Sequence, residues 1–343
     1  MKPETTEDVL DLLDAHSTAA ALGAAMQLGL FWLLTEQTLS ASDIADALGI
    51  PAYRCRYWLQ VLSRSGLLEE TSSGYAASPT ARRAILGAYS QSSWALLAEE
   101  AGQRSHALRD LALHIPDPGP APAAQETLSL DYVARMSESA DRARRFTRML
   151  YEIHGPLADR LAALLDLSSA TRLMDLGGGS GVVSMALLRR YPHLTAVVVD
   201  IENVCKAGRE LAAENSLEDR ITFHAADVLR DKLLSGFDVV LECDVNVYTE
   251  ALFRKVRAAL SPGGRFFIVD YFAPARGVAP PSRAHWALER SLSDPEFSYP
   301  SAAAAKSLLE EVGFRVVAEG TLSAHGETPS RYASGLSVIE ACT

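Results

Sequence analysis

A run of glycines between an apolar stretch and a helical stretch is the feature that most limits how this chain can fold. Residues 172–194 read RLMDLGGGSGVVSMALLRRYPHL, with three consecutive glycines at Gly177–Gly179 and a fourth at Gly181. The apolar residues before the glycines have the length of a buried strand, and Val182–Arg190 has helical periodicity. The stretch therefore predicts a strand, a tight glycine turn and the first turn of a helix. Glycine suits such a turn because it accepts positive φ and lets a ligand reach the N–H groups of the helix.

Two aspartates indicate what kind of ligand this turn holds. Asp175 stands just before the glycines, and a second buried strand, Leu194–Asp200, ends in Asp200. A carboxylate at the end of the second strand suits the two hydroxyls of a ribose. The glycines alternate as G-x-G-x-G rather than G-x-G-x-x-G, and Asp175 would repel a pyrophosphate but accept hydrogen bonds from an ammonium group. A ligand with a ribose and an amino-acid cation fits this pattern, and S-adenosylmethionine is such a ligand.

The motifs resemble those of class I S-adenosylmethionine-dependent methyltransferases over residues 170–264, with DLGGGSG identifying the superfamily. With YPHLTAVVVDIENV after it, the whole chain is similar to the small-molecule O-methyltransferases of bacteria and plants, the group related to acetylserotonin and caffeate methyltransferases. The resemblance implies an α/β, Rossmann-like domain with a mostly parallel, seven-stranded sheet and an N-terminal, mostly helical winged-helix dimerisation domain. It also implies methyl transfer from S-adenosylmethionine to a small secondary metabolite, most readily at oxygen, with S-adenosylhomocysteine as the product.

The N-terminal third predicts a winged helix. Helical spacing covers Asp8–Leu34, Leu39–Gly49 and Ala52–Ser65, and two short strands, Leu67–Glu70 and Gly74–Ala77, form a hairpin after them. In the family that the chain resembles, this module forms the homodimer. We therefore expect a dimerisation domain over residues 1–113, a helical connection that walls the active site over 114–168, and a cofactor-binding domain over 169–343.

A winged helix also raises the alternative of a transcription regulator. Arg54, Arg56 and Arg64 lie on the helix at 52–65, which carries no acidic residue and so suits DNA phosphates. The same helix is apolar on more than one face, which suits a protein interface better than a DNA groove. The formal net charge of −11 also argues against nucleic acid or an anionic membrane as the main partner.

Composition places few further limits on the chain. At 343 residues, 48% hydrophobic and 22% charged, it has the make-up of a globular protein with room for two or three domains. The N-terminus lacks the pattern of a signal peptide, the apolar runs are too short to span a membrane, and the four cysteines are scattered. We expect a cytoplasmic protein without disulfides and without a metal site.

Strands alternate with helices from residue 172 to 271, which predicts a parallel sheet with its ligand at the carboxyl ends of the strands. A last strand, Ser337–Ala341, is expected antiparallel at the sheet's end. By resemblance, Asp227 meets the adenine amino group and Val228 packs on the ring. The residues expected to bind the cofactor are Asp175, Gly177, Gly179, Asp200, Ile201, Asp227, Val228 and Glu242.

Two segments are expected to form the acceptor pocket. The helix RFTRMLYEIHGPL, Arg145–Leu157, stands where the family has the wall of its active site, and it offers Met149, Tyr151 and His154. Pro280–Tyr299 would pass over the pocket. It offers His285, Trp286 as an apolar wall and Arg290 as a clamp for a carboxylate.

The general base of the family is absent from its usual place. In the family a histidine follows the fourth strand, but here the stretch LECDVNVYTEALF, Leu241–Phe253, contains no histidine. Three explanations stay open. Another group can be the base, with His154, His285, Asp244 and Tyr248 as candidates. The acceptor can be an acidic hydroxyl, a nitrogen, or a carbon of an enolisable 2-oxo acid or electron-rich ring. Finally, the fold can hold the cofactor for a reaction other than methylation.

Overall fold

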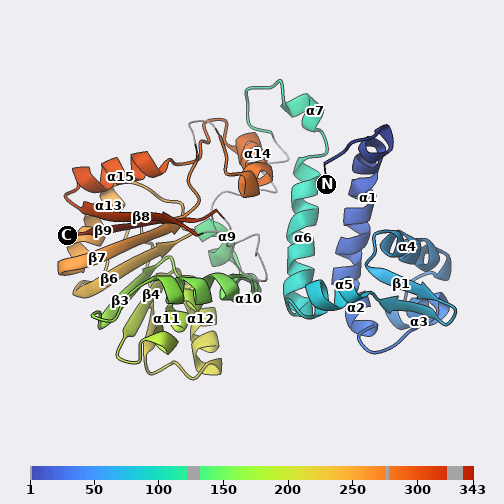
Figure 1. The fold of residues 1–343 in the computed structure, drawn as a ribbon, viewed down its shortest axis with the longest axis horizontal. Helices are drawn as coiled ribbons and strands as arrows, with labels where there is room; N and C mark the ends of the chain where they lie inside the picture. The colour runs from blue at the N-terminus through green and yellow to red at the C-terminus, as the bar shows by residue number, and fades with distance from the viewer. Residues whose placement is uncertain (1, 122–131, 275–277, 323–334) are drawn as a thin grey trace. The chain divides into compact units, whose positions relative to one another are not determined.

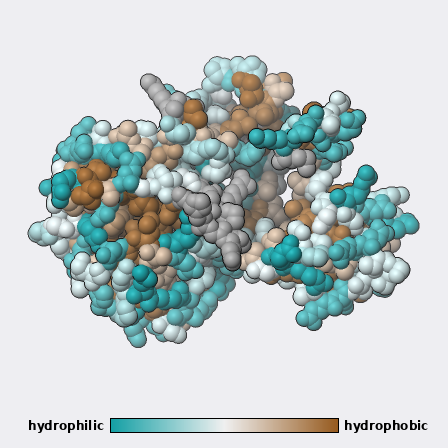
Figure 2. Space-filling model, viewed as in Figure 1, coloured by the Kyte–Doolittle hydropathy of each residue, from teal (hydrophilic) through white to brown (hydrophobic). Residues whose placement is uncertain are grey.

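The computed structural model describes residues 2–121, 132–274, 278–322 and 335–343. The chain divides into two compact units, Met1–Arg109 and Asp110–Thr343. The stretch predicted as a connection, 114–168, is thus part of the second unit wherever it is described. Hydrophilic side chains cover most of the visible face of each unit, with hydrophobic patches between them (Figure 2). In the described parts of the chain, no helix combines the length and the apolar composition needed to cross a bilayer.

The first unit contains the predicted winged helix. Its elements are α1 (Thr6–Leu28), α2 (Leu30–Leu33), α3 (Ala41–Leu48), α4 (Ala52–Arg64), β1 (Leu68–Thr71), β2 (Gly74–Ala77), α5 (Pro79–Ala81), η1 (Arg82–Leu86) and α6 (Gln91–Ala107). Strands β1 and β2 pair antiparallel, with Leu68 opposite Ala77. Ser40 caps α3 by accepting the Asp43 N–H.

The single helix predicted over Asp8–Leu34 is wrong in one respect, because it ends at Leu28 and restarts at Leu30. Gly29 separates the two parts with a φ of 77°, in the left-handed region that glycine tolerates best. The Gln91 side chain lies where a Cβ at Gly29 would stand. A tight turn therefore interrupts the helical spacing at this glycine.

The second unit is a seven-stranded sheet between two layers of helices (Figure 1). Its strands are β3 (Arg172–Leu176), β4 (Thr195–Asp200), β5 (Ile221–Ala225), β6 (Phe237–Cys243), β7 (Leu260–Asp270), β8 (Arg315–Thr321) and β9 (Ser337–Cys342). Its described helices are α7 (Leu111–His114), α9 (Tyr132–Glu138), α10 (Ala140–Leu164), α11 (Val182–Arg190), α12 (Glu202–Glu214), α13 (Glu250–Ala259), η2 (Pro281–Arg283), α14 (Ala284–Ser293) and α15 (Ala302–Glu311). One core lies between the sheet and α10, α11 and α12, and the other between the sheet and α13 and α15.

The sheet runs in the order β5-β4-β3-β6-β7-β9-β8, with β5 to β7 parallel and β9 antiparallel to both of its neighbours. The predicted mostly parallel sheet is confirmed. The last strand, however, lies inside the sheet, and β8 forms the edge. Burial explains this order, because β9 carries the buried Val338, Ile339 and Ala341 whereas most residues of β8 are exposed. The more apolar strand takes the interior position.

The stretch before β3 contains two described helices, α9 and α10. They meet at Ser139, whose side chain accepts the N–H of Arg142 and caps α10. The face of α10 that packs on the rest of the unit, with Ile153, Leu157 and Leu161 buried, decides which of its residues face the ligand cavity described below.

Candidate active site

The carboxyl ends of β3, β4, β5 and β6 open into a cavity of about 650 Å³, which α9, α10 and the η2–α14 segment cover. All of its wall residues belong to the second unit: Tyr132, Val133, Arg135, Phe146, Leu150, His154, Leu157, Asp175, Gly177, Gly178, Gly179, Ser180, Val182, Val183, Asp200, Ile201, Ala226, Asp227, Val228, Leu229, Cys243, Asp244, Val245, Asn246, Val247, Arg283, Trp286, Arg290 and Tyr299. In open α/β sheets, ligands bind outside the carboxyl ends of the strands, and this cavity lies there.

Asp175 is a buried carboxylate with one oxygen left for a ligand. It is 1% exposed at the end of β3, and its Oδ2 accepts a hydrogen bond of 2.6 Å from the Ser184 hydroxyl of α11. Its Oδ1 has no hydrogen-bond donor among the described residues. Burial raises its pKa to about 6 against the opposing Ser184 bond, and the charge of Asp200 raises it further. An unpartnered buried oxygen in a cavity wall suits a cationic donor such as an ammonium group.

The glycine turn leaves room for that carboxylate. A Cβ on Gly178 would lie 2.4 Å from the Asp175 carboxyl carbon, so a larger residue would displace it. Gly177 and Gly179 have φ values of 66° and 56°, which glycine adopts without strain. A Cβ on Gly179 would meet nothing within 4 Å, so open space lies beside its backbone.

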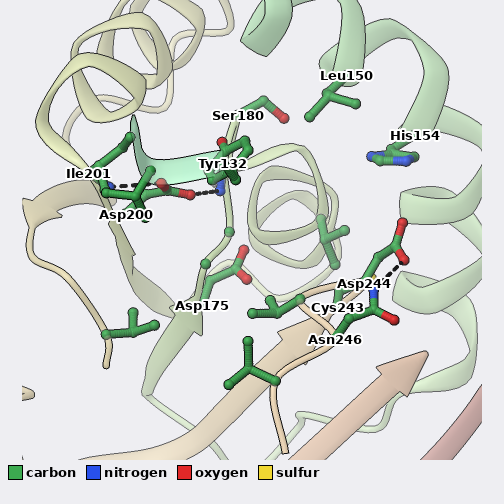
Figure 3. A pocket seen from close by; sticks show the side chains of 18 of the residues that line it. Tyr132, Leu150, His154, Asp175, Ser180, Asp200, Ile201, Cys243, Asp244 and Asn246 are labelled. Carbon is green, nitrogen blue, oxygen red and sulfur yellow. Dashed lines mark hydrogen bonds between the residues drawn. The ribbon is translucent and has the colours of Figure 1, made fainter. Parts of the chain in front are cut away.

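Asp200 lies at the end of β4 and links the turn to the next helix (Figure 3). Its Oδ2 accepts the Gly179 N–H at 2.9 Å and its Oδ1 accepts the Ile201 N–H at 2.7 Å. Burial raises the pKa of Asp200 to about 6, and these two N–H groups oppose the rise. Each carboxylate oxygen keeps acceptor capacity, so the pair can receive two hydroxyl donors such as those of a ribose.

Two further residues predicted for the cofactor, Asp227 and Val228, follow β5 and line the cavity. Asp227 Oδ1 accepts the Leu229 N–H at 2.9 Å, which fixes the turn beside an apolar wall. The same cavity wall therefore contains Asp175, Gly177, Gly179, Asp200, Ile201, Asp227 and Val228. These residues fit a ligand with an ammonium group, a ribose and a planar base.

Glu242 is not in the cavity wall, in contrast to its predicted place with the cofactor. It is 0% exposed, neither of its carboxylate oxygens has a side-chain hydrogen-bond partner among the described residues, and burial raises its pKa well above the ordinary value. Side chains along a strand alternate between faces. Leu241 and Cys243 pack on the side of α10 and α11, so Glu242 between them points to the opposite face.

An ion pair and a histidine stand on the other side of the cavity. Asp244 directly follows β6 with a φ of 56°, and Arg283 Nη2 lies 3.2 Å from its Oδ2. Burial lowers the pKa of His154, while Asp244 raises it and Arg283 lowers it. Figure 3 shows His154 and Asp244 facing the same part of the cavity. A histidine with a lowered pKa is neutral near pH 7, the form that can accept a proton.

The rotational phase of α10 brings a different set of residues to the cavity than the sequence predicts. Phe146, Leu150, His154 and Leu157 line it from α10, at spacings of four, four and three. Met149, predicted to touch the substrate, is buried outside the cavity wall. The other predicted residue, Tyr151, donates a hydrogen bond of 2.8 Å to Asn215 Oδ1. Each helical residue turns by about 100°, so the neighbours of Leu150 point elsewhere.

Helix α14 and the residues that follow it place three aromatic rings and one cation at this side of the cavity. Trp286 and Arg290, which the sequence offers as substrate contacts, both line the cavity, one helical turn apart. The rings of Trp286, Phe297 and Tyr299 lie pairwise 5.5 Å apart between centroids. The Arg290 guanidinium lies 5.0 Å from the Trp286 ring centroid and 5.6 Å from that of Phe297. Sequence reasoning did not identify Phe297 or Tyr299.

Two candidate bases do not reach the cavity. His285 precedes Trp286 on α14 and is exposed, outside the cavity wall, because adjacent helical residues point about 100° apart. Tyr248 donates its hydroxyl hydrogen to Asp270 Oδ2. Burial and the charge of Asp270 raise the pKa of Tyr248 far above its ordinary value, so it does not ionise near neutral pH. No group of three potential metal ligands occurs in the parts of the chain that the structure describes.

Family models match residues in both units of the chain. A family model described as an O-methyltransferase domain matches residues 126–315, and one described as an O-methyltransferase dimerisation domain matches residues 10–86. The chain is 31% identical to a 3-hydroxy-5-methyl-1-naphthoate 3-O-methyltransferase of Streptomyces sahachiroi over 76% of this chain and 75% of the relative. It is 27% identical to the N,N-dimethyltransferase OxyT of Streptomyces rimosus over 90% of each chain.

Solved structures show the same fold. The mitomycin 7-O-methyltransferase MmcR superposes with a TM-score of 0.81 at 21% identity, over 98% of this chain and 97% of that one. Human N-acetylserotonin methyltransferase, solved in complex with S-adenosylmethionine, superposes with a TM-score of 0.78 at 18% identity, over 100% of this chain and 99% of that one.

Proposed function

The chain belongs to the O-methyltransferase family and uses S-adenosylmethionine, and within this family we propose that it methylates a hydroxyl group of a small aromatic molecule with His154 as general base. The observation that carries the proposal is that His154 and Asp244 stand in the wall of the same cavity as Asp175 and Asp200. When bound, S-adenosylmethionine supplies a methyl group activated by its sulfonium. The chain has to orient the acceptor and remove its proton.

The donor half of the cavity fits the cofactor by its chemistry. The free Oδ1 of Asp175 would accept hydrogen bonds from the ammonium group, and Asp200 would accept those of the ribose hydroxyls. Asp227 and Val228 would meet the adenine. The glycine turn keeps side chains away from this part of the cavity.

The acceptor half supplies a base from a different element than the family does. Asp244 stands in the stretch after β6 where the family has its histidine, and His154 of α10 faces it. A neutral imidazole nitrogen of His154 would take the hydroxyl proton while the acceptor oxygen bonds to the methyl carbon and the carbon–sulfur bond breaks. The Asp244 carboxylate would then stabilise the imidazolium, as a carboxylate does beside a catalytic histidine.

Nitrogen methylation is a second candidate, favoured by the likeness to the N,N-dimethyltransferase OxyT. A neutral amine attacks the methyl carbon directly and needs a base only afterwards, so it would depend less on His154. Methylation of a ring carbon, open from the sequence, would use the phenolate that His154 generates. Proton and carbon NMR of the product separates attachment to oxygen, nitrogen and carbon.

The experiment replaces His154 and compares the result with the other histidine candidate. With a panel of phenols as acceptors, we expect His154→Gln to lower kcat by about a hundredfold or more, since a general base contributes that much. The matched control is His285→Gln, which is exposed outside the cavity and should keep kcat within about twofold of the wild type. A loss below tenfold in His154→Gln contradicts the base assignment. Failure of the wild type to form S-adenosylhomocysteine with any acceptor contradicts methylation.

We also propose that the first unit forms a homodimer. The match to a dimerisation domain supports it, and so does a set of exposed apolar side chains on α1 and α4: Val9, Leu10, Leu12, Leu13, Tyr53 and Tyr57. Exposed apolar side chains gathered on neighbouring elements favour a protein partner. Sedimentation of the full chain gives its mass, and a band shift with random duplex at low salt tests the rival of DNA binding.

A further inference from the structure

Arg290 occupies a position between two cavities. Its side chain is partly buried on α14, packed against the rings of Trp286 and Phe297. It lines the main cavity together with His154, and it also lines a second cavity of about 490 Å³. The two cavities share Asn246, Trp286, Arg290 and Tyr299. A ligand that reaches this part of either cavity would therefore lie beside the Arg290 guanidinium.

Within the described residues, no carboxylate forms an ion pair with Arg290, and its buried Nε has no hydrogen-bond acceptor. The contrast is Arg283 in the same wall, whose guanidinium is paired with Asp244 at 3.2 Å. Burial lowers the pKa of Arg290, and the charge of Asp294 opposes that effect without forming an ion pair. A partly buried cation held only by aromatic rings gains from an added anion.

We propose that Arg290 binds a carboxylate of the acceptor, so that the substrate is an aromatic acid that carries the hydroxyl to be methylated. This inference rests on the proposed function. The guanidinium offers a planar fork that matches a carboxylate in a bidentate manner. The rings of Trp286 and Tyr299, which line the main cavity beside it, offer a wall for a planar aromatic body.

Charge indicates from which side the carboxylate approaches. Asp294 and Glu296 line the second cavity and would repel an anion there. On the side of the main cavity, the acid of the acceptor half, Asp244, is already paired with Arg283. The carboxylate is therefore expected on the side of His154, with the hydroxyl directed towards that base.

Pairs of probes that differ only in charge test the proposal. Calorimetry with S-adenosylhomocysteine present would measure binding of a hydroxynaphthoate against its carboxamide, and of salicylate against salicylamide. For the wild type we expect the carboxylate of at least one pair to bind about tenfold or more tightly, since a charge-assisted hydrogen bond contributes that much. The difference should vanish in Arg290→Leu and return in part in Arg290→Lys. Arg315→Leu, an exposed arginine on the edge strand, is the control and should behave as wild type.

Several outcomes would overturn the inference. One is that no carboxylate binds more tightly than its amide in the wild type, and another is that the preference survives in Arg290→Leu. A third is that Arg290→Leu loses affinity for S-adenosylhomocysteine itself, which would assign the guanidinium to the cofactor's own carboxylate. The proposed function is tested separately, by whether the wild type methylates uncharged phenols, because that result does not depend on Arg290 binding a carboxylate.

Discussion

The two halves of the cavity are built in opposite ways. The donor half comes largely from one continuous segment, from Asp175 to Ile201, in which a strand, a turn, a helix and a second strand follow each other. The acceptor half gathers residues far apart in the sequence, such as His154, Asp244 and Arg290, from three separate elements. The donor half carries the buried acids Asp175 and Asp200, and the acceptor half carries His154, two arginines and an aromatic wall.

The difference indicates that the fold itself defines the donor half, whereas the acceptor half can change through its side chains. In the donor half, backbone groups and strand ends define the site, as where Asp200 receives the N–H groups of Gly179 and Ile201. In the acceptor half, side chains define the site. A substitution can therefore transfer a role, such as that of the general base, from one element to another. The base offers an example, since the stretch after β6 has Asp244 and no histidine, while His154 faces it from α10.

The largest expected effect tests the donor half. Asp175→Asn should weaken binding of S-adenosylmethionine about a hundredfold, since it removes the charge opposite the ammonium group. Asp200→Asn should weaken it about tenfold, because one of its oxygens becomes an N–H donor facing backbone N–H groups. Calorimetry on folded variants measures both, with the exposed Asp219→Asn as the control. Unchanged affinity in the two cavity variants would show that the cofactor binds elsewhere.

The donor half could be predicted from the sequence for physical reasons. Its residues follow rules of short range, because a strand that ends in an aspartate and turns through glycines leaves little freedom to the backbone. Asp175, Gly177 and Asp200 were each identified in this way and line the cavity. Glu242 followed the same rule of strand ends but points to the opposite face, because the rule does not say which face of the sheet a side chain takes.

The acceptor half could be predicted only in part, because it depends on the rotation of helices. The segment Arg145–Leu157 was identified as a wall, but which of its residues face the cavity depends on how the buried side of α10 packs on the rest of the unit. Met149 and Tyr151 of α10 and His285 of α14 lie outside the cavity wall, while His154, Trp286 and Arg290 line it. The order of the last two strands depends on β9 being more buried than β8. A local sequence pattern does not contain this comparison between two separate strands.

The pH dependence of cofactor binding is the next test of the donor half. Burial raises the pKa of Asp175 and Asp200 to about 6 from 3.8, so each carboxyl binds a proton more tightly in the folded protein than in the unfolded chain. Their protonation stabilises the free protein fully below about pH 4, and this stabilisation is lost as the pH rises through about 6. A ligand with an ammonium group requires Asp175 in its ionised form. The affinity for such a ligand therefore rises as the pH rises.

We therefore expect the affinity for S-adenosylhomocysteine to rise up to tenfold per pH unit for each proton released, until about pH 6, and to level off above pH 7. Calorimetry from pH 5 to 8 in buffers of different ionisation enthalpy measures the affinity and the protons released. In Asp175→Asn the slope should fall. A flat profile over this range in the wild type would contradict the assignment of these carboxylates to the cofactor.

The smallest expected effect tests the rotation of α10, using two adjacent residues. Leu150 lines the cavity, so Leu150→Ala should raise the KM for the acceptor a few-fold, as lost apolar contact does, and leave that for S-adenosylmethionine unchanged. Tyr151→Phe removes the hydrogen bond to Asn215, so it should lower the free energy of unfolding by about 1 kcal/mol without changing either KM. Steady-state kinetics and denaturant unfolding measure these values. The reverse result, with the KM for the acceptor responding to residue 151, would mean that α10 is rotated by about one residue and that His154 no longer faces Asp244.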